Sequence, residues 1–218
     1  MTIHHGDRAG IVRNLLNACL HPFASRADAA AAMVPVEVSR IRLQGVGEYE
    51  RASTPLGAAL LSNGGTVGWR PADGRATPQH YGAMADGVAD DTAALAAVLL
   101  RGGAVFIPDG TYRIAGAGAD AGGVQAQITT GLRVKCGPNA RFVADHLDND
   151  MIRLSVPADG AGLPADGIAL HWQGGTFDQR AQKVSSVVPF GALYPAPAGL
   201  AGTSATCEAL SIRGEYQA

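Results

Sequence analysis

Lysine and glutamate are scarce in this 218-residue sequence, which has 2 lysines beside 15 arginines and 5 glutamates beside 14 aspartates. Charged residues make up 17% of the chain, below the roughly 25% of an average soluble domain. Glutamate favours helix interiors, whereas aspartate favours turns and helix caps. Together with 29 glycines and 12 prolines, this imbalance predicts many turns and little helix.

Other absences exclude whole classes of protein. No apolar run approaches the ~20 residues of a membrane-spanning helix, so we expect no membrane insertion. A net charge of −2 lacks the basic excess of nucleic-acid-binding proteins, so we expect no nucleic-acid partner. Cys19, Cys136 and Cys207 form no CxxC pair, which excludes a zinc ribbon and predicts free thiols. The first residues lack the basic start of a signal peptide, which predicts synthesis in the cytoplasm.

The first seventy residues contain short helices and strands. Residues 7–20 have the apolar spacing of one helix face, which either packs on its own domain or docks to a partner. The docking residues would then be Ile11, Val12, Leu15 and Leu16. Residues 25–28 resemble a helix capping box, residues 36–43 resemble an interrupted strand, and Asn63-Gly64 between apolar runs predicts a hairpin. We therefore predict a small α+β unit with a linker over residues 1–76.

The remainder, residues 77–218, is predicted to be mainly β. A helix is expected over residues 91–100, and Gly102-Gly103 ends it. Short strands follow, separated by turn residues: Ala104–Ile107, Thr111–Ile114, Leu132–Cys136, Arg141–Ala144, Met151–Val156, Ile168–Trp172 and Ala209–Arg213. Residues 179–206 lack a strand pattern. From the pattern alone, a sandwich, a barrel and a parallel β-helix all stay open.

Two stretches carry a resemblance to a known family. Residues 81–95 read YGAMADGVADDTAAL, and residues 103–114 read GAVFIPDGTYRI. This composite motif resembles the opening of the pectate-lyase-like superfamily of right-handed parallel β-helices. The resemblance implies that residues 77–218 form the first coils and that the helix at 91–100 caps them. The implied entry and cap residues are structural: Gly82, Asp86, Gly87, Asp90, Asp91, Thr92, Pro108, Gly110 and Tyr112.

Residues 20–76 are similar to the N-terminal units of bacteriophage tailspikes and related virion spikes, including those of gene transfer agents. The similar stretches are residues 23–28, the Val-Pro pair at 34–35 and residues 66–71. This resemblance implies a homotrimeric spike on the surface of a phage-like particle. Its partners would be other virion proteins (capsid, portal, tail or spike base) and a host surface polysaccharide.

Two alternatives remain beside the structural spike. One is a polysaccharide depolymerase, a lyase or glycoside hydrolase, whose catalytic coils lie beyond residue 218. The other is a non-viral, cell-surface carbohydrate-binding module. The last predicted strand stops just before Ala218 without a capping helix, which would leave unpaired edges. We therefore expect the β-helix to be incomplete and this chain to be non-catalytic and free of cofactors.

Several residues have side chains suited to catalysis, metal binding or sugar binding, but a structural role explains each of them more simply. Asp90-Asp91 resembles a carboxylate pair for glycoside hydrolysis, but adjacent residues at a helix start favour capping. The acidic residues Asp145, Asp148 and Asp150 offer calcium ligands, yet the EF-hand pattern fails and a solvated turn is favoured. Trp69 and Trp172 have rings that stack on sugars or pack in a core. We favour packing, and predict no metal site.

Overall fold

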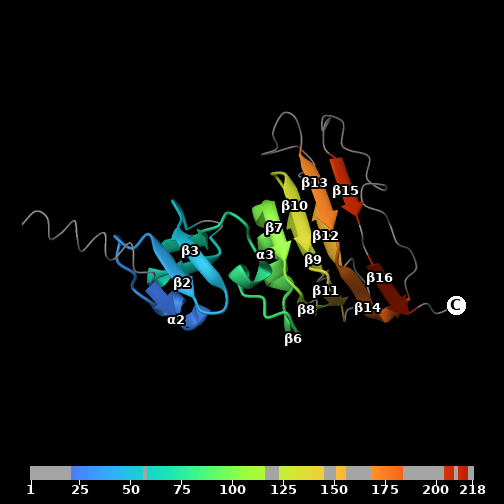
Figure 1. Cartoon of the computed structure of the whole chain (residues 1–218), viewed down its shortest axis with the longest axis horizontal. Coiled ribbons are helices and arrows are strands. Elements are labelled where there is room, and N and C mark those ends of the chain that lie inside the picture. The colour runs from blue at the N-terminus through green and yellow to red at the C-terminus, as the bar shows by residue number, and fades with distance from the viewer. Residues whose placement is uncertain are drawn as a thin grey trace, which may run out of the picture. The chain divides into compact units, whose positions relative to one another are not determined.

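The computed structural model describes residues 21–55, 58–115, 123–144, 151–155, 168–183, 204–208 and 211–215. Within these ranges the chain is mainly β, with several sheets and short helices (Figure 1). The chain divides into two compact units, Met1–Gly74 and Arg75–Ala218. Ala76 pairs with Val105 of the second unit, which therefore begins slightly before the boundary expected at residue 77.

The first unit is built on a five-stranded sheet with the order β1-β2-β3-β5-β4. β1 and β2 are parallel, and the other pairs are antiparallel. The elements are β1 His21–Phe23, α2 Arg26–Ala31, β2 Arg40–Leu43, β3 Gly47–Arg51, β4 Leu60–Ser62, the 3-10 helix η1 Asn63–Gly65 and β5 Val67–Pro71. The core buries Val38, Ile41, Tyr49 and Trp69 completely. Burial of such side chains contributes roughly 1.5–3 kcal/mol each.

Two local predictions in this unit are confirmed. The Ser25 hydroxyl caps α2 by accepting a hydrogen bond from the Asp28 N–H at 3.1 Å. β4 and β5 form the predicted hairpin, and Asn63 adopts the left-handed region at φ 53°, which asparagine tolerates better than most residues. The strand expected over residues 36–43 is right only in its second half, because β2 begins at Arg40.

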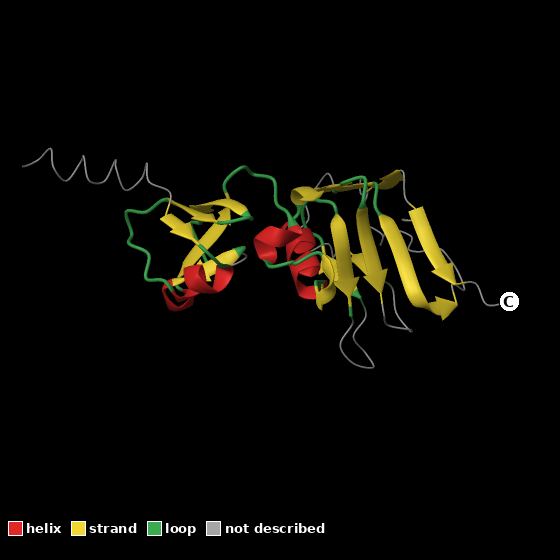
Figure 2. Cartoon of the chain, turned by 60° about the horizontal axis from the view of Figure 1, so that its bottom comes forward, coloured by secondary structure: helices red, strands yellow, loops and turns green. Residues whose placement is uncertain are grey.

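Parallel strands form three sheets in the second unit (Figure 2). Its elements are η2 Pro78–Tyr81, β6 Asp86–Asp90, α3 Thr92–Arg101, β7 Gly103–Ile107, β8 Gly110–Ile114, β9 Val124–Gln127, β10 Leu132–Cys136, β11 Ala140–Ala144, β12 Ile152–Ser155, β13 Ala169–Gln173, β14 Thr176–Lys183, β15 Ser204–Glu208 and β16 Ser211–Glu215. The sheet orders are β7-β10-β13-β15, β6-β8-β11-β14-β16 and β9-β12. All pairs in these sheets are parallel.

The strands of these sheets succeed one another in a repeating order. β7, β8 and β9 are followed by β10, β11 and β12, and each strand of the second set pairs with its counterpart in the first. β13 and β15 extend the first sheet, and β14 and β16 extend the second. The register aligns Val105 with Val134 and Val134 with Trp172. Buried positions of successive strands are therefore neighbours.

Aromatic rings fill the interior of the second unit. Tyr112, Phe142 and Phe177 hold matching register positions on β8, β11 and β14. Their ring centroids are 5.6 Å apart between Tyr112 and Phe142 and 4.8 Å apart between Phe142 and Phe177. The Trp172 ring lies 6.0 Å from that of Phe142. Such pairs contribute about 0.5–1.5 kcal/mol beyond the burial of their area.

The helix predicted over residues 91–100 is confirmed as α3, which packs on β9 and η2. Its buried face joins the interior through Ala94, Leu95, Val98 and Leu99. Gly102, at φ 70°, follows the last helical residue. A Cβ atom there would lie 2.0 Å from the Thr130 hydroxyl oxygen. The position therefore requires glycine both for its backbone conformation and for space.

The predicted strands of the second unit all overlap observed ones, but the prediction missed others. Strands β6 and β9 were not predicted from the sequence. The expectation that residues 179–206 contain no strand is wrong, because β14 continues to Lys183 and β15 begins at Ser204. Among the described residues, no helix is long and apolar enough to cross a membrane.

Candidate functional site

The predicted entry residues lie on β6 and β8, at the start of α3, directly after η2 and in the turn between β7 and β8, all in the second unit. Gly82 ends η2 at φ 103°, and Gly87 adopts φ 76° within β6. A Cβ atom on Gly87 would approach the Thr111 side chain of β8 to 3.1 Å. These glycines allow the chain to turn sharply where β6 joins the edge of the sheet.

Asp91 is the buried anchor of this region, and only 1% of its surface is exposed. Its carboxylate accepts hydrogen bonds from the N–H groups of Met84 and Ala85 at 2.7 and 3.1 Å. Its own N–H donates to the Arg113 carbonyl at 2.8 Å. Burial raises the pKa of the Asp91 carboxyl, although these hydrogen bonds act in the opposite direction. One residue thus joins the segment before β6, strand β8 and the start of α3.

Asp90 has different partners from its neighbour. Its carboxylate accepts hydrogen bonds from the N–H and hydroxyl of Thr92 and from the Ala115 N–H at 3.3 Å. Burial works against ionisation of Asp90, but the hydrogen bonds from Thr92 and Ala115 outweigh it and lower the pKa. Two backbone N–H groups of its own turn, both at 2.8 Å, lower the pKa of Asp86.

The Asp90-Asp91 pair was expected to cap the helix, and these contacts show that the two residues contribute to the cap in different ways. Asp91 occupies the N-cap position of α3, but its side chain makes no capping hydrogen bond there. Asp90 instead bonds the N–H of the first helical residue, Thr92, at 3.1 Å. Both carboxylates are engaged by nearby donors and are directed to different segments. This arrangement favours a structural role over a carboxylate pair that acts on a glycosidic bond.

Tyr112 connects the entry to the aromatic interior and is fully buried. Its hydroxyl donates to the Pro108 carbonyl at 3.0 Å and accepts from the Gln79 side-chain amide at 2.9 Å. Burial raises the pKa of Tyr112 to about 12. At Gly110, a Cβ atom would come within 2.8 Å of the Ala85 Cβ, so this close approach requires glycine.

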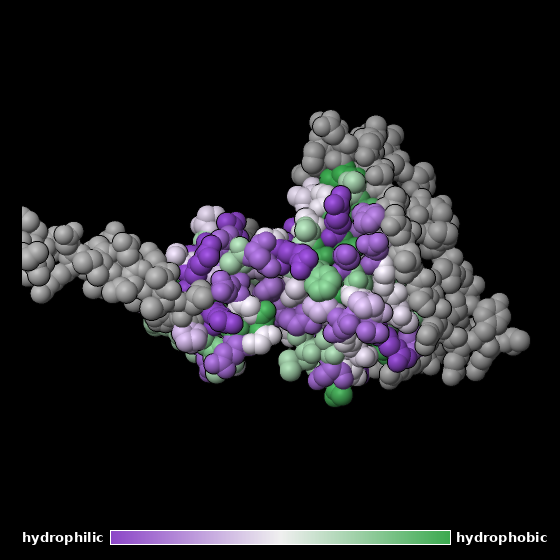
Figure 3. Space-filling model, in the orientation of Figure 1, coloured by the Kyte–Doolittle hydropathy of each residue, from purple (hydrophilic) through white to green (hydrophobic). Residues whose placement is uncertain are grey.

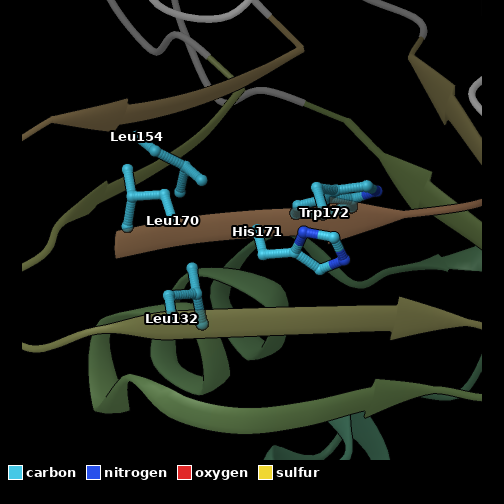
Figure 4. Close-up of a pocket in the computed structure, with 5 residues that line it drawn as sticks. All are labelled: Leu132, Leu154, Leu170, His171 and Trp172. Atoms are coloured by element: carbon cyan, nitrogen blue, oxygen red, sulfur yellow. The ribbon is translucent and has the colours of Figure 1, made fainter. Parts of the chain in front are cut away.

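The tryptophans lie in the cores, as the packing interpretation predicted. Trp69 is fully buried and Trp172 is 2% exposed. A shallow pocket beside Trp172 is lined by Leu132, Leu154, Leu170, His171 and Trp172 (Figure 4). It encloses no space for a water molecule. Neither indole therefore presents a ring face to a sugar.

Two groups of predicted site residues lie outside the described residues. They are the docking residues Ile11, Val12, Leu15 and Leu16 and the calcium candidates Asp145, Asp148 and Asp150. In the part of the chain that the structure describes, no group of three His, Cys, Asp or Glu residues is placed to hold a metal ion. Cys136 is a buried free thiol, and burial raises its pKa to about 12.

Sequence reasoning missed the exposed side chains of the β7-β10-β13 sheet. Arg133 and Lys135 alternate with buried residues along β10, and this strict alternation was the signal that they face outward.

Comparisons with protein-family models, curated proteins and solved structures found no match to this chain. The function is therefore inferred from the residues and geometry of the chain itself.

Proposed function

We propose that this chain is a structural spike subunit of a phage-like particle. Its N-terminal region attaches to the particle, and its second unit is the capped beginning of a right-handed parallel β-helix that projects toward a host surface polysaccharide. The observation that carries this proposal is the repeated succession of β7-β8-β9 and β10-β11-β12, with parallel in-register pairing between the sets. That succession is the connectivity of a coiled solenoid.

The way in which the first strands are covered provides further support for the proposal. A solenoid end exposes apolar side chains and strand edges, and needs a cover. α3 places Leu95, Val98 and Leu99 in the same core as the strands that follow it. Asp91 holds the segment before β6 against β8 and α3. The right hand of the coil follows from the strong preference of parallel strand connections for that hand.

The anchor is assigned to the N-terminal region on the resemblance of residues 20–76 to spike N-termini. The apolar face predicted from the sequence, with Ile11, Val12, Leu15 and Leu16, would dock on a capsid, portal, tail or spike-base protein. Trimeric assembly would bury side faces of a short β-helix and stabilise it. Light scattering of the purified chain should then give three times the 22.3 kDa mass of one chain. A monomeric mass would contradict assembly through this part of the spike.

Particle fractionation tests the location. Phage-like particles purified by density gradient from producing cells should contain the chain, whereas the cell-envelope fraction should not. The double variant Leu15→Asp/Leu16→Asp should weaken incorporation, because it places charges on the docking face. Arg133→Gln/Lys135→Gln, on exposed positions of β10 in the second unit, is the matched control. Presence in the envelope and absence from particles would favour a cell-surface binding module instead.

An activity assay tests the non-catalytic assignment separately. The purified chain is incubated with capsular polysaccharide, and new reducing ends or the absorbance of unsaturated uronates are measured. We expect no product, since the described carboxylates of the entry are bound to backbone N–H groups. Product release would show that this chain is a depolymerase.

A further inference from the structure

His80 is a buried histidine near the start of the second unit, with 5% of its surface exposed. It lies on the 3-10 helix η2, three residues after Thr77. The Thr77 N–H donates a hydrogen bond to His80 Nδ1 at 3.1 Å, and the Thr77 hydroxyl lies 3.0 Å from the same nitrogen. The His80 N–H in turn donates to the Thr77 carbonyl at 3.1 Å. His80 therefore holds both the N–H and the carbonyl of Thr77.

These hydrogen bonds fix the charge of the His80 ring. A backbone N–H can only donate, so Nδ1 must accept, and a ring nitrogen that accepts carries no proton. The ring is therefore neutral, with its single proton on Nε2. Protonation of Nδ1 would oppose two N–H groups and break the bond from Thr77. A histidine in an unfolded chain takes up this proton at about pH 6.5, so acid opposes the closed arrangement.

The residues before His80 cover the edge of strand β7. This strand is the last of its sheet, and Ala76 forms a parallel bridge with it. The Ala76 N–H donates to the Ala104 carbonyl at 3.2 Å, and the Phe106 N–H donates to the Ala76 carbonyl at 2.9 Å. We call residues 75–81 the entry segment. Within it, Ala76 is bound to β7 and the next residue is bound to His80.

The entry segment is held by separate contacts, whereas β7 pairs with β10 along all of its residues. The Arg75 guanidinium carbon lies 4.8 Å from the centroid of the Phe106 ring, in a cation–π contact. The Gln79 amide donates to the Tyr112 hydroxyl at 2.9 Å, and η2 packs on α3. Segments of this kind open at a lower free energy than the paired strands of a sheet. The entry segment should therefore open before β7 leaves β10.

The elements that contact the entry segment carry other charged and titratable groups. Arg75 belongs to the segment itself, Arg101 is the last residue of α3, and Asp91 precedes the first. The arginines keep their charge at all pH values of interest. Burial raises the pKa of Tyr112 to about 12, so this hydroxyl keeps its proton. Burial also raises the pKa of the Asp91 carboxyl, so the test must separate Asp91 from His80.

We infer that His80 is a pH-sensitive contact that controls how readily the entry segment opens. Above about pH 6.5 the neutral ring binds Thr77 and holds the segment closed. Below that pH the open form gains a proton that the closed form excludes, so the equilibrium shifts toward opening. This inference goes beyond the spike proposal and does not rest on attachment to a particle.

Opening of the entry segment would uncover the edge of β7. The Phe106 N–H and the Ala104 carbonyl would lose their partner Ala76 and become available for pairing with another strand. Such an edge offers backbone groups, unlike the face of the second unit in Figure 3, where hydrophilic and hydrophobic side chains are intermixed. Acid would therefore give the chain a contact surface that the closed form covers.

Amide hydrogen exchange of the full chain tests this inference at the hydrogen bond that opening would break. The probe is the Phe106 N–H, and its exchange rate is divided by that of an unstructured peptide at the same pH. Its protection should fall about tenfold between about pH 7.5 and pH 5.5, because the open form binds one more proton below about pH 6.5. Amides of β10, which is paired on both sides, should change less than twofold.

Two variants assign the proton to its residue. His80→Asn places an amide oxygen where Nδ1 can be replaced as an acceptor, and this oxygen does not titrate. Its Phe106 protection should change less than twofold over the same pH range. The matched control, His171→Asn, removes a histidine of β13 and should keep the tenfold fall. An equal fall in the wild type and in His80→Asn would overturn the inference and assign the proton to another group, such as Asp91.

A second measurement uses the wild-type chain alone and so does not depend on the folding of a variant. The ¹⁵N chemical shifts of the His80 ring at about pH 7.5 should show an unprotonated Nδ1 and a protonated Nε2. A proton on Nδ1 at this pH would contradict the hydrogen bond from Thr77 and overturn the inference. Constant protection of the Phe106 N–H in the wild type would overturn it as well.

Discussion

The two units bury aromatic side chains in different ways. In the first, Trp69 is the buried indole of an antiparallel sheet, and its N–H donates to the Ser62 hydroxyl at 2.9 Å. The Arg51 guanidinium covers the same ring at 4.8 Å. In the second, Phe142 has a stacked ring on either side, Tyr112 and Phe177. The first unit therefore depends on individual contacts, whereas the second repeats one contact along successive strands.

The two units also differ in how their strands bring surface residues together. The first unit pairs its charges across antiparallel strands, as in the Arg70–Glu50 ion pair at 2.8 Å. In the second unit, parallel strands place residues from distant parts of the sequence side by side in rows. The Arg141–Asp178 ion pair joins two such residues, on β11 and β14.

The largest expected effect comes from breaking the aromatic stack. Phe142→Ala should lower the free energy of unfolding by about 3–5 kcal/mol, because it opens a cavity in a close-packed interior. Urea unfolding followed by Trp172 fluorescence, in a Trp69→Phe background, measures the second unit. Phe106→Ala is the control, since it removes an outward ring of the same type and should cost about 1 kcal/mol. Equal losses would contradict the importance of the stack.

The next largest effect is expected at the entry. Asp91→Ala removes the acceptor of the Met84 and Ala85 N–H groups, which should destabilise the second unit by about 2–3 kcal/mol. Asp91→Asn keeps one side-chain acceptor oxygen and should cost less. The same fluorescence titration measures both variants. If Asp91→Ala unfolds at the wild-type urea concentration, Asp91 is not an anchor.

The first unit offers a comparable test at Asn63. Its side chain accepts from the Val34 N–H at 2.9 Å and donates to the Val34 carbonyl at 3.0 Å. Asn63→Ala loses both bonds and places alanine at φ 53°, with an expected cost of about 1–2 kcal/mol. Asn63→Gly loses the bonds without the backbone strain. A glycine variant less stable than the alanine variant would contradict a contribution from the backbone conformation.

How much of this fold was predictable depends on the kind of strand. β10 is predicted residue for residue, because Leu132–Cys136 alternates strictly between buried and exposed positions. β14 was missed because residues 178–180 and 182–183 are all polar or charged, so the strand has little apolar alternation of its own. Its position is set by parallel pairing with β11. Periodicity within a segment cannot reveal a strand that is defined by its neighbours.

The candidate site was predictable to a similar degree. The motif located the entry residues, but two adjacent aspartates in a sequence do not reveal which one is buried. Only the arrangement of the segment before β6 directs Asp91 inward and leaves Asp90 near the surface. The placement of Arg133 beside His171 was not predicted either, because these residues become neighbours only through the register of β10 and β13.

The smallest expected effect separates these two aspartates by their response to pH. Asp90→Ala should cost about 1 kcal/mol at neutral pH, as for the loss of a helix cap. The pKa of Asp90 is lowered in the folded chain, so its stabilisation is present above the ordinary aspartate pKa and is lost as pH falls through the lowered value. The difference in unfolding free energy between wild type and Asp90→Ala should therefore shrink in acid. Asp90→Asn, which keeps an acceptor without a titrating group, is the control, and a difference that stays constant down to about pH 2 would contradict this role of the Asp90 charge.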